Sequence, residues 1–198
     1  MALAVLARGT PFFAIDFTIT RAVQAAEWGP LRPALDLLNA IGFPPVVDVV
    51  DGAIVGVLFL AGLRWESVVA TFAALGAAGL NAAVKLLVPR DRPPDSLVHV
   101  AHHLPSSSFP AGHVSSITAF LGLLTSVALV RMPASRRRSA LVVALVVTIA
   151  LMGVARIQSG EHWPSDVLGA YLLGATWLAG PIALYEWGRR RGFGRWGR

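Results

Sequence analysis

The sequence contains no cysteine and has few charged residues for its length. Across 198 residues, the absence of cysteine excludes disulfide bridges, thiolate metal sites and a cysteine nucleophile. Charged residues make up only 14% of the chain, whereas soluble domains carry about 25%. Apolar residues make up 55%, and the mean hydropathy is +0.64. This composition is typical of an integral membrane protein and excludes an ordinary soluble domain.

Several uncharged stretches have nearly the length of a membrane span, which is about 20 residues. The four clearest are residues 67–84, 114–130, 139–155 and 167–185. A fifth stretch, residues 45–63, carries Asp48 and Asp51 in its first turns, where carboxylates can still reach the interface. We therefore expect an all-α fold: a polytopic membrane bundle of about five transmembrane helices that forms one domain over residues 1–198.

The first 35 residues show a different pattern. Charged and polar residues alternate there with apolar residues that recur at helical spacing. The apolar residues are Phe12, Ile15, Ile19, Val23 and Ala26. This pattern predicts a helix that lies in the membrane interface. The alternative is a sixth span that begins near Ala2 and is interrupted by Arg8 and Pro11. Because Arg8 follows the apolar start instead of preceding it, we expect no signal peptide.

Basic residues concentrate on one side of the expected membrane. Consecutive spans alternate in direction, so three basic segments share a side and hold ten of the 17 Lys and Arg residues. They are Arg64, then Arg131, Arg136, Arg137 and Arg138, then Arg189, Arg190, Arg191, Arg195 and Arg198. By the positive-inside rule this side is cytoplasmic, which explains the net charge of +6 without nucleic acid as a partner. We expect an integral protein of the bacterial inner membrane.

The opposite, outward face receives cations, histidines and a carboxylate from several span ends. In chain order these residues are Lys85, Arg92, His113, Arg156, His162 and Asp166. Taken singly, each is typical of a capping or interfacial residue. Their convergence on one face predicts an anion site with acid and base groups.

The chemistry of these residues favours a phosphoryl group. Arginine offers forked donors that suit phosphate oxygens, and lysine adds a point charge. Ala111 and Gly112 lie just before an uncharged helix, whose free N–H groups and dipole can hold an oxyanion. His162 and Asp166 are four residues apart, so Asp166 could hold one imidazole N–H and leave the other nitrogen free to attack.

The sequence implies no metal or other cofactor. Its carboxylates near the expected site are scattered and do not form a ligand cluster: Asp48, Asp51, Asp91 and Asp95. His99, His102 and His103 offer an alternative metal site in the loop of residues 91–109. A polar loop holds histidines without a metal more often than with one, so this alternative is the weaker.

Three segments together carry a spaced motif: Lys85-x6-Arg92-Pro93, Phe109-Pro110-Ala111-Gly112-His113 and Arg156-x5-His162-x3-Asp166. Over about residues 80–175 it resembles the signature of the type 2 phosphatidic acid phosphatase (PAP2) superfamily. The resemblance implies that His162 is a nucleophile forming a phosphohistidine, Asp166 its orienting residue and His113 the general acid. It also implies that Lys85, Arg92 and Arg156 bind phosphate, and that no metal is required.

Two positions depart from this signature. The second motif of the family usually reads Pro-Ser-Gly-His and the third usually begins Ser-Arg, but this chain has Ala111 and Ala155. A hydroxyl donor is therefore missing at residue 111, and one oxyanion donor can contribute roughly 3 kcal/mol. Either backbone N–H groups or a nearby serine compensate, or turnover is slow, or residue 111 has been substituted. The nearby serines are Ser106, Ser107 and Ser108.

The resemblance implies a metal-independent enzyme that dephosphorylates a lipid phosphate or diphosphate at the outer interface. Candidate substrates are a polyprenyl diphosphate such as undecaprenyl diphosphate, slightly favoured by analogy, phosphatidic acid and phosphatidylglycerol phosphate. Haloperoxidases share the motifs, but the membrane spans and the short chain argue against that activity. The remaining alternative is a catalytically weak or inactive lipid-phosphate-binding membrane protein on the same fold. The pattern does not indicate an oligomeric state.

Overall fold

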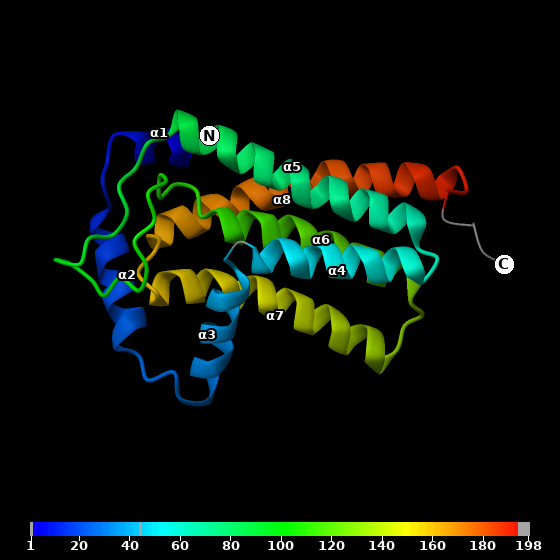
Figure 1. Ribbon diagram of the computed structural model, residues 1–198, viewed down its shortest axis with the longest axis horizontal. Helices are drawn as coiled ribbons and strands as arrows, with labels where there is room; N and C mark the ends of the chain where they lie inside the picture. The colour runs from blue at the N-terminus through cyan, green and yellow to red at the C-terminus, as the bar shows by residue number, and fades with distance from the viewer. Residues whose placement is uncertain (1, 44, 194–198) are drawn as a thin grey trace.

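The computed structural model describes residues 2–43 and 45–193, and over these ranges the chain contains helices and no strand (Figure 1). In chain order the helices are α1 (Ala2–Arg8), α2 (Ala14–Ala25), a 3-10 turn (Gly29–Leu31), α3 (Arg32–Ile41), α4 (Val46–Leu60), α5 (Arg64–Leu87), α6 (Gly112–Arg131), α7 (Arg136–Gln158) and α8 (Pro164–Arg190). The predicted all-α fold is confirmed.

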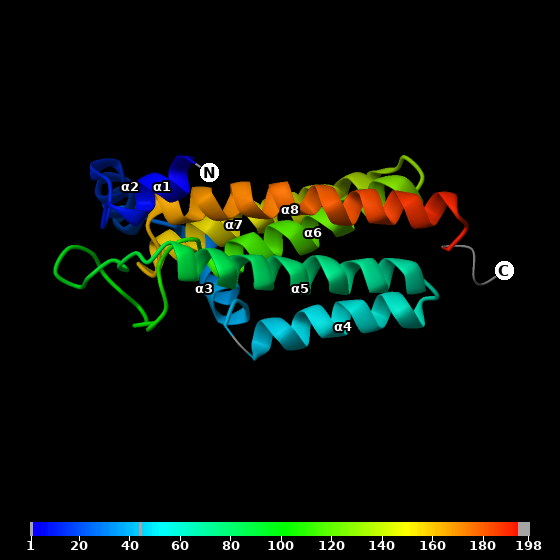
Figure 2. The same ribbon diagram turned by 90° about the horizontal axis from the view of Figure 1, so that it is seen from above.

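Four long helices, α5, α6, α7 and α8, run side by side as a bundle, and each is long and apolar enough to cross a membrane. The shorter α4 lies at the periphery against α5 (Figure 2). Helix α4 meets the segment 29–41 at an angle of 89°, and this bent pair counts as a fifth crossing when it is taken as one span. The described residues therefore agree with the prediction of about five spans.

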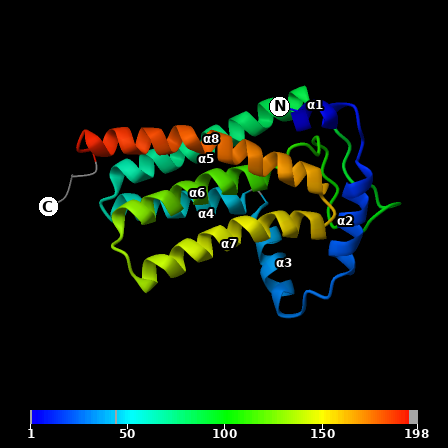
Figure 3. The same ribbon diagram turned by 180° about the vertical axis from the view of Figure 1, so that it is seen from behind.

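The N-terminal segment does not form a sixth span. Helices α1 and α2 have only 7 and 12 residues, too few to cross a bilayer. Helix α2 lies across one end of the bundle instead of running along it (Figures 1 and 3). The sixth-span alternative is thus wrong, and a short helix, α2, is observed where the interfacial helix is expected.

Helix α6 lies at the centre and packs against α5, α7 and α8. One apolar cluster joins it to α5 and α8 through residues that include Ala73, Phe120 and Tyr185. Close approach of α6 and α8 depends on Gly174, because a Cβ atom there would lie only 2.6 Å from the carbonyl oxygen of Ser115. This packing holds the start of α6 beside the start of α8.

The two ends of the bundle differ in charge. The basic segments that include Arg64, Arg131 and residues 136–138 share the end where α5 and α7 begin and α6 and α8 end. Arg195 and Arg198 lie outside the described residues. A buried carboxylate at this end, Glu66, accepts a hydrogen bond of 2.8 Å from Nε of Arg131. The other end carries the candidate site.

Candidate active site

All the predicted site residues lie at one end of the bundle, where α5 and α7 end and α6 and α8 begin. The long loop between α5 and α6, residues 88–111, covers this end and projects beyond it (Figure 2). The loop before α8 turns sharply at Gly160, whose φ of +70° favours glycine. A Cβ atom on Gly160 would also lie 1.9 Å from the carbonyl oxygen of His99. The turn leads directly into His162.

His162 is buried, and its two ring nitrogens face different partners. Nδ1 lies 2.8 Å from the carbonyl oxygen of Ser108, and Nε2 lies 3.3 Å from Nη1 of Arg92. A carbonyl can only accept a hydrogen bond and a guanidinium can only donate one. The proton therefore sits on Nδ1, and Nε2 carries the lone pair.

The environment of His162 also favours the neutral ring. Burial lowers the pKa of His162 from 6.5 to about 4. The positive charge of Arg92 contributes to this lowering of the pKa, whereas the nearby carboxylate of Asp166 opposes it. At neutral pH, His162 thus has an unprotonated Nε2.

Asp166 approaches His162 but does not bond to it directly. Its Oδ2 lies 3.9 Å from Nδ1 of His162, which is beyond hydrogen-bond distance. Oδ2 accepts hydrogen bonds from Ser108 Oγ at 2.5 Å and from the backbone N–H of Trp163 at 2.9 Å. Ser108 therefore connects the two residues, because its carbonyl holds the imidazole and its hydroxyl holds the carboxylate. The direct contact expected from the i, i+4 spacing is replaced by this bridge.

Two cations face His162 from the end of α5 and the loop that follows it. Lys85 lies in the last turn of α5, and its Nζ donates a hydrogen bond to the carbonyl oxygen of Ser107. Arg92 donates from Nη1 to the carbonyl oxygen of Glu161 at 2.7 Å and from Nε to that of Ser106 at 2.9 Å. Backbone acceptors thus fix both cations, while burial lowers the pKa of Arg92 and nearby carboxylates oppose that shift.

Arg156 has a different setting from the other two cations. It is fully buried, and its Nη1 donates to Oε2 of Glu161 at 2.7 Å. Its Nη2 donates to the carbonyl oxygen of Asn39 at 2.9 Å, and Phe43 lies under the guanidinium, with a ring centroid 5.0 Å from Cζ. Nε of Arg156 has no hydrogen-bond partner among the described residues. Arg156 therefore supports the loop before α8, and it does not line the cavity beside His162.

The start of α6 brings Gly112 and His113 to the site. Both line the cavity that His162 also faces. The first N–H groups of a helix have no partner within the helix, so the start of α6 offers free donors. Asn81 of α5 packs against this start, because a Cβ atom on Gly112 would lie 3.1 Å from Asn81 Oδ1.

Ala111 lies just behind this surface. Its backbone N–H donates to the carbonyl oxygen of Asp166 at 3.2 Å, so this donor is already used. Its side chain is fully buried in an apolar cluster with residues that include Val114 and Met152, and it does not line the cavity. No side chain caps α6 at this position.

The cavity has a volume of about 700 Å³ and two chemically distinct parts. One end carries the polar groups of Lys85, Arg92, His113 and His162. The rest extends between α4 and α5 along mostly apolar residues: Val47, Val55, Ala74, Leu75 and Ala78. Asp48 and Asp51 of α4 also line it. The cavity thus joins a cationic end to an apolar groove.

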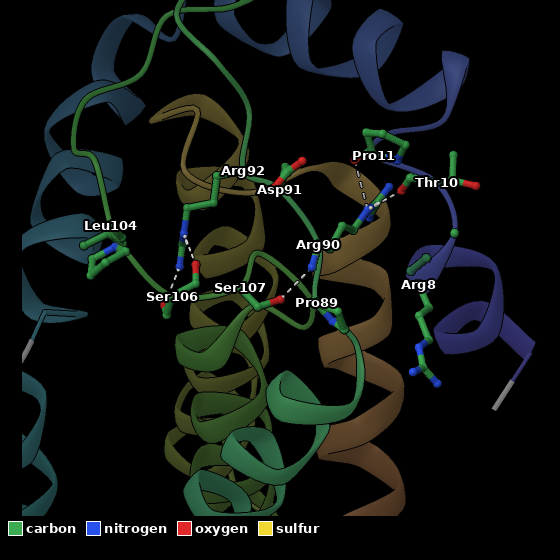
Figure 4. A pocket seen from close by; sticks show the side chains of 13 residues that line it. Arg8, Thr10, Pro11, Pro89, Arg90, Asp91, Arg92, Leu104, Ser106 and Ser107 are labelled. Atoms are coloured by element: carbon green, nitrogen blue, oxygen red, sulfur yellow. Dashed lines mark hydrogen bonds between the residues drawn. The ribbon is translucent and has the colours of Figure 1, made fainter.

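A second cavity, of about 500 Å³, lies between the N-terminal segment and the loop after α5 (Figure 4). Arg92 and Ser106 line both cavities, and Nη2 of Arg92 donates to Ser106 Oγ at 3.1 Å. Figure 4 shows this pair on one side of the second cavity, and it shows Arg90 as another residue that lines this cavity. The pair therefore lies between the second cavity and the cavity that His162 lines.

The described residues contain no group of three or more His, Asp or Glu side chains that could hold a metal ion. His102 instead pairs with Glu161, with Nδ1 and Oε1 2.9 Å apart. His103 pairs with Asp95 at 3.2 Å, and the backbone N–H of His99 donates to Gln24. The three loop histidines therefore have separate partners.

Several residues at the site were not identified from the sequence as part of it. Ser108 was considered only as a substitute phosphate donor, and Glu161, Asn81 and Asp16 were given no role. Partners distant in sequence bind Ser108, Asn81 and Asp16. Glu161 instead pairs with Arg156, which lies five residues before it. Only Glu161 had a local signal: an acidic residue directly before the histidine of the motif.

Comparison with known proteins finds a family model and a relative that match part of this sequence. The model of the PAP2 superfamily matches residues 66–191. A decaprenylphosphoryl-5-phosphoribose phosphatase of Mycobacterium tuberculosis, found in two strains, is 34% identical over 125 residues. That match covers 63% of this chain and 64% of the relative, so the chain aligns with somewhat less than two thirds of the relative's length.

Two solved structures have a similar fold. A transmembrane PAP2-type phosphatidylglycerolphosphate phosphatase from Bacillus subtilis superposes with a TM-score of 0.79 at 20% identity, over 93% of this chain and 91% of the other. LpxE from Aquifex aeolicus superposes with a TM-score of 0.66 at 21% identity, over 86% of this chain and 96% of the other. At this level of identity the two structures support the fold alone.

Proposed function

The chain belongs to the PAP2 superfamily, as its motifs predicted, and on that premise we propose that it removes a terminal phosphate from a membrane lipid phosphate. The observation that carries the proposal is the setting of His162. A neutral imidazole with its lone pair on Nε2 lies 3.3 Å from a guanidinium, at the polar end of a cavity whose remainder is apolar. A nucleophile, an anion-binding group and a lipid groove thus meet in one cavity.

In the first step, His162 Nε2 attacks the phosphorus atom and forms a P–N bond while the bond to the lipid oxygen breaks. His113 gives a proton to the leaving oxygen. Lys85 and Arg92, with the free N–H groups at the start of α6, hold the other phosphate oxygens as charge shifts onto them. The product of this step is the dephosphorylated lipid and a phosphohistidine.

In the second step, water attacks the phosphohistidine. His113 now accepts a proton from the water, the P–N bond breaks, and inorganic phosphate leaves. Nδ1 of His162 keeps its proton throughout, because this N–H donates a hydrogen bond to the carbonyl oxygen of Ser108. Every group in this cycle belongs to the chain, so we propose that the reaction needs no metal.

Arg156 has an indirect role in this arrangement. It neutralises Glu161, whose carbonyl oxygen accepts from Arg92. Direct phosphate binding by Arg156, as the family resemblance implies, would use its unpartnered Nε or displace Glu161 from Nη1. Glu161 is thus a candidate internal competitor of the substrate for Arg156.

We propose a lipid with a long isoprenoid chain as the substrate class. The Mycobacterium tuberculosis relative is named for a decaprenylphosphoryl sugar phosphate, and a cavity of about 700 Å³ leaves room for a headgroup larger than one phosphate. The basic residues at the far end of the bundle favour an outward-facing site by the positive-inside rule. The headgroup would then enter from the outer leaflet, and the tail would remain between α4 and α5.

A second candidate is a protein that binds lipid phosphates without turnover, and Ala111 is the observation that favours it. The test uses purified protein in micelles and measures phosphate release from four lipids, with and without EDTA. The lipids are decaprenylphosphoryl-5-phosphoribose, undecaprenyl diphosphate, phosphatidic acid and phosphatidylglycerol phosphate. Release that survives EDTA and is fastest with an isoprenoid lipid supports the proposal. Binding without release from any of the four supports the second candidate, and loss of release in EDTA contradicts the metal-free mechanism.

A further inference from the structure

The face of α2 that packs on the bundle carries buried polar residues, whereas apolar side chains are exposed on its outer face. Asp16 and Thr20 are fully buried, but Ile15 is 61% exposed. An isolated carboxylate is costly to bury unless it is paired and hydrogen-bonded. The burial of Asp16 therefore calls for specific partners.

Asp16 binds the first turn of α8, which carries Asp166. Its Oδ1 accepts from the backbone N–H of Ser165 at 2.8 Å, and its Oδ2 accepts from Ser165 Oγ at 2.7 Å. Oδ2 also accepts from Nη2 of Arg90 at 3.0 Å. A carboxylate of α2 thus binds the segment directly after His162.

Arg90 connects Asp16 to Asp166. Its Nη1 donates to Oδ1 of Asp166 at 2.5 Å, and both charged side chains are completely buried. Its Nε donates to the carbonyl oxygens of Thr10 and Pro11 (Figure 4). The fork of the guanidinium is therefore held on three sides, and a buried arginine lies between two buried carboxylates.

This network continues to the nucleophile. One oxygen of Asp166 binds Arg90, and the other accepts from Ser108, whose carbonyl in turn accepts from Nδ1 of His162. The backbone N–H of Ser108 also donates to the carbonyl oxygen of Arg90 at 2.9 Å. Aromatic packing also joins the N-terminal segment to the residue after His162, because Phe12 stacks on Trp163 with ring centroids 4.9 Å apart.

We propose that Asp16 is a positioning residue for the reaction: through Arg90 and Ser165 it fixes Asp166 and Ser108, and so the orientation and tautomer of His162. This inference rests on the proposed function of His162. Asp16 lies outside residues 66–191, which match the family model. Helix α2 therefore supplies contacts that position the catalytic groups and that the matched region alone does not contain.

The test compares Asp16→Asn with Thr20→Val. Thr20 is buried one turn further along the same face of α2, and its Oγ1 has no hydrogen-bond partner among the described residues. Asp16→Asn is expected to lower kcat by roughly 10- to 100-fold with KM within about twofold, because misplaced catalytic groups cost rates of this order. Thr20→Val is expected to retain kcat. Equal kcat values for Asp16→Asn and the parent would overturn the proposal, as would an equal loss in Thr20→Val.

A second readout does not need turnover. In ¹⁵N-histidine NMR spectra without substrate, the parent is expected to show His162 entirely as the Nδ1–H tautomer, and Asp16→Asn a mixture of tautomers. An unchanged tautomer would contradict the role of Asp16 even if kcat fell.

If the parent released no phosphate, the proposed function would fail, and the tautomer comparison would still decide the role of Asp16. If Asp16→Asn did not fold, Ser165→Ala would serve, since it removes contacts of the same network without changing charge.

Discussion

Nη1 of Arg92 lies 3.3 Å from Nε2 of His162, so the cation proposed to bind phosphate touches the nitrogen proposed to attack it. A phosphate oxygen that binds Arg92 would bring the phosphorus atom close to Nε2. Such positioning converts binding into reaction geometry. The guanidinium also disfavours protonation of the ring, so Nε2 stays unprotonated at neutral pH.

The lowered pKa of His162 predicts an unusual titration. Because the neutral ring is the proposed nucleophile, activity through His162 is expected above its pKa and should be lost as pH falls through about 4, not through 6.5. NMR titration of ¹⁵N-labelled histidine in the substrate-free protein measures this value directly. The His162 signal is identified by its absence in His162→Asn. A midpoint at 6.5 or above would contradict the account of the buried ring.

The role of His113 predicts a dependence on the leaving group. A general acid matters most when the leaving group is a poor one such as an alkoxide, and such catalysis typically contributes 10²- to 10⁴-fold. His113→Ala is therefore expected to lower kcat by about 100-fold with phosphatidic acid. The loss should be much smaller with undecaprenyl diphosphate, whose leaving group is already a phosphate monoester. Equal losses for the two lipids would argue against His113 as the acid.

Ala111→Ser is expected to change stability more than rate. Residue 111 is the uncapped N-cap of α6, and a serine there typically stabilises a helix by about 1 kcal/mol. Because Ala111 packs in an apolar cluster and does not line the cavity, kcat should change less than tenfold. Thermal unfolding and steady-state kinetics of the same preparation test both parts. A gain of tenfold or more, about 1.4 kcal/mol, would show that the missing hydroxyl limits the reaction.

The alternating spans predict the accessibility of single cysteines. Asp95, in the loop over the site, and Ser135, between α6 and α7, lie at opposite ends of the bundle. With cysteine at these positions, a membrane-impermeant thiol reagent should label Asp95→Cys from outside and Ser135→Cys only after the cells are opened. The parent has no cysteine and provides a blank. Labelling of both from one side would contradict the topology.

The sequence predicted the long helices well, because their uncharged stretches end at clear signals. Lys85 and Pro89 mark the end of α5, and Pro164 marks the start of α8. The bent arrangement of α3 and α4 was not predicted, because the two short apolar segments carry no local signal for their relative direction. The spacing of apolar residues predicted α2 as an interfacial helix, but it did not predict that Asp16 and Thr20 of α2 are buried.

The site was predictable where the residues lie within one motif and less so where they meet across the fold. The i, i+4 spacing brought Asp166 near His162, but the bridge through Ser108 depends on a loop 54 residues earlier in the chain. The pairing of Arg90 with Asp16 spans 74 residues, and no periodicity indicates it. The motif predicts Arg156 as a phosphate ligand, because the spacing alone does not show that Arg156 forms an ion pair with Glu161.

The most direct test of the central claim is phosphate release by His162→Ala, measured beside the parent with the best lipid substrate. Loss of the nucleophile is expected to lower kcat by at least about 1000-fold, while lipid binding persists because Lys85 and Arg92 remain. Rapid quenching of the parent with ³²P-labelled substrate should trap a base-stable phosphoryl label that the variant lacks. Near-normal turnover in His162→Ala would show that phosphate transfer does not pass through this histidine.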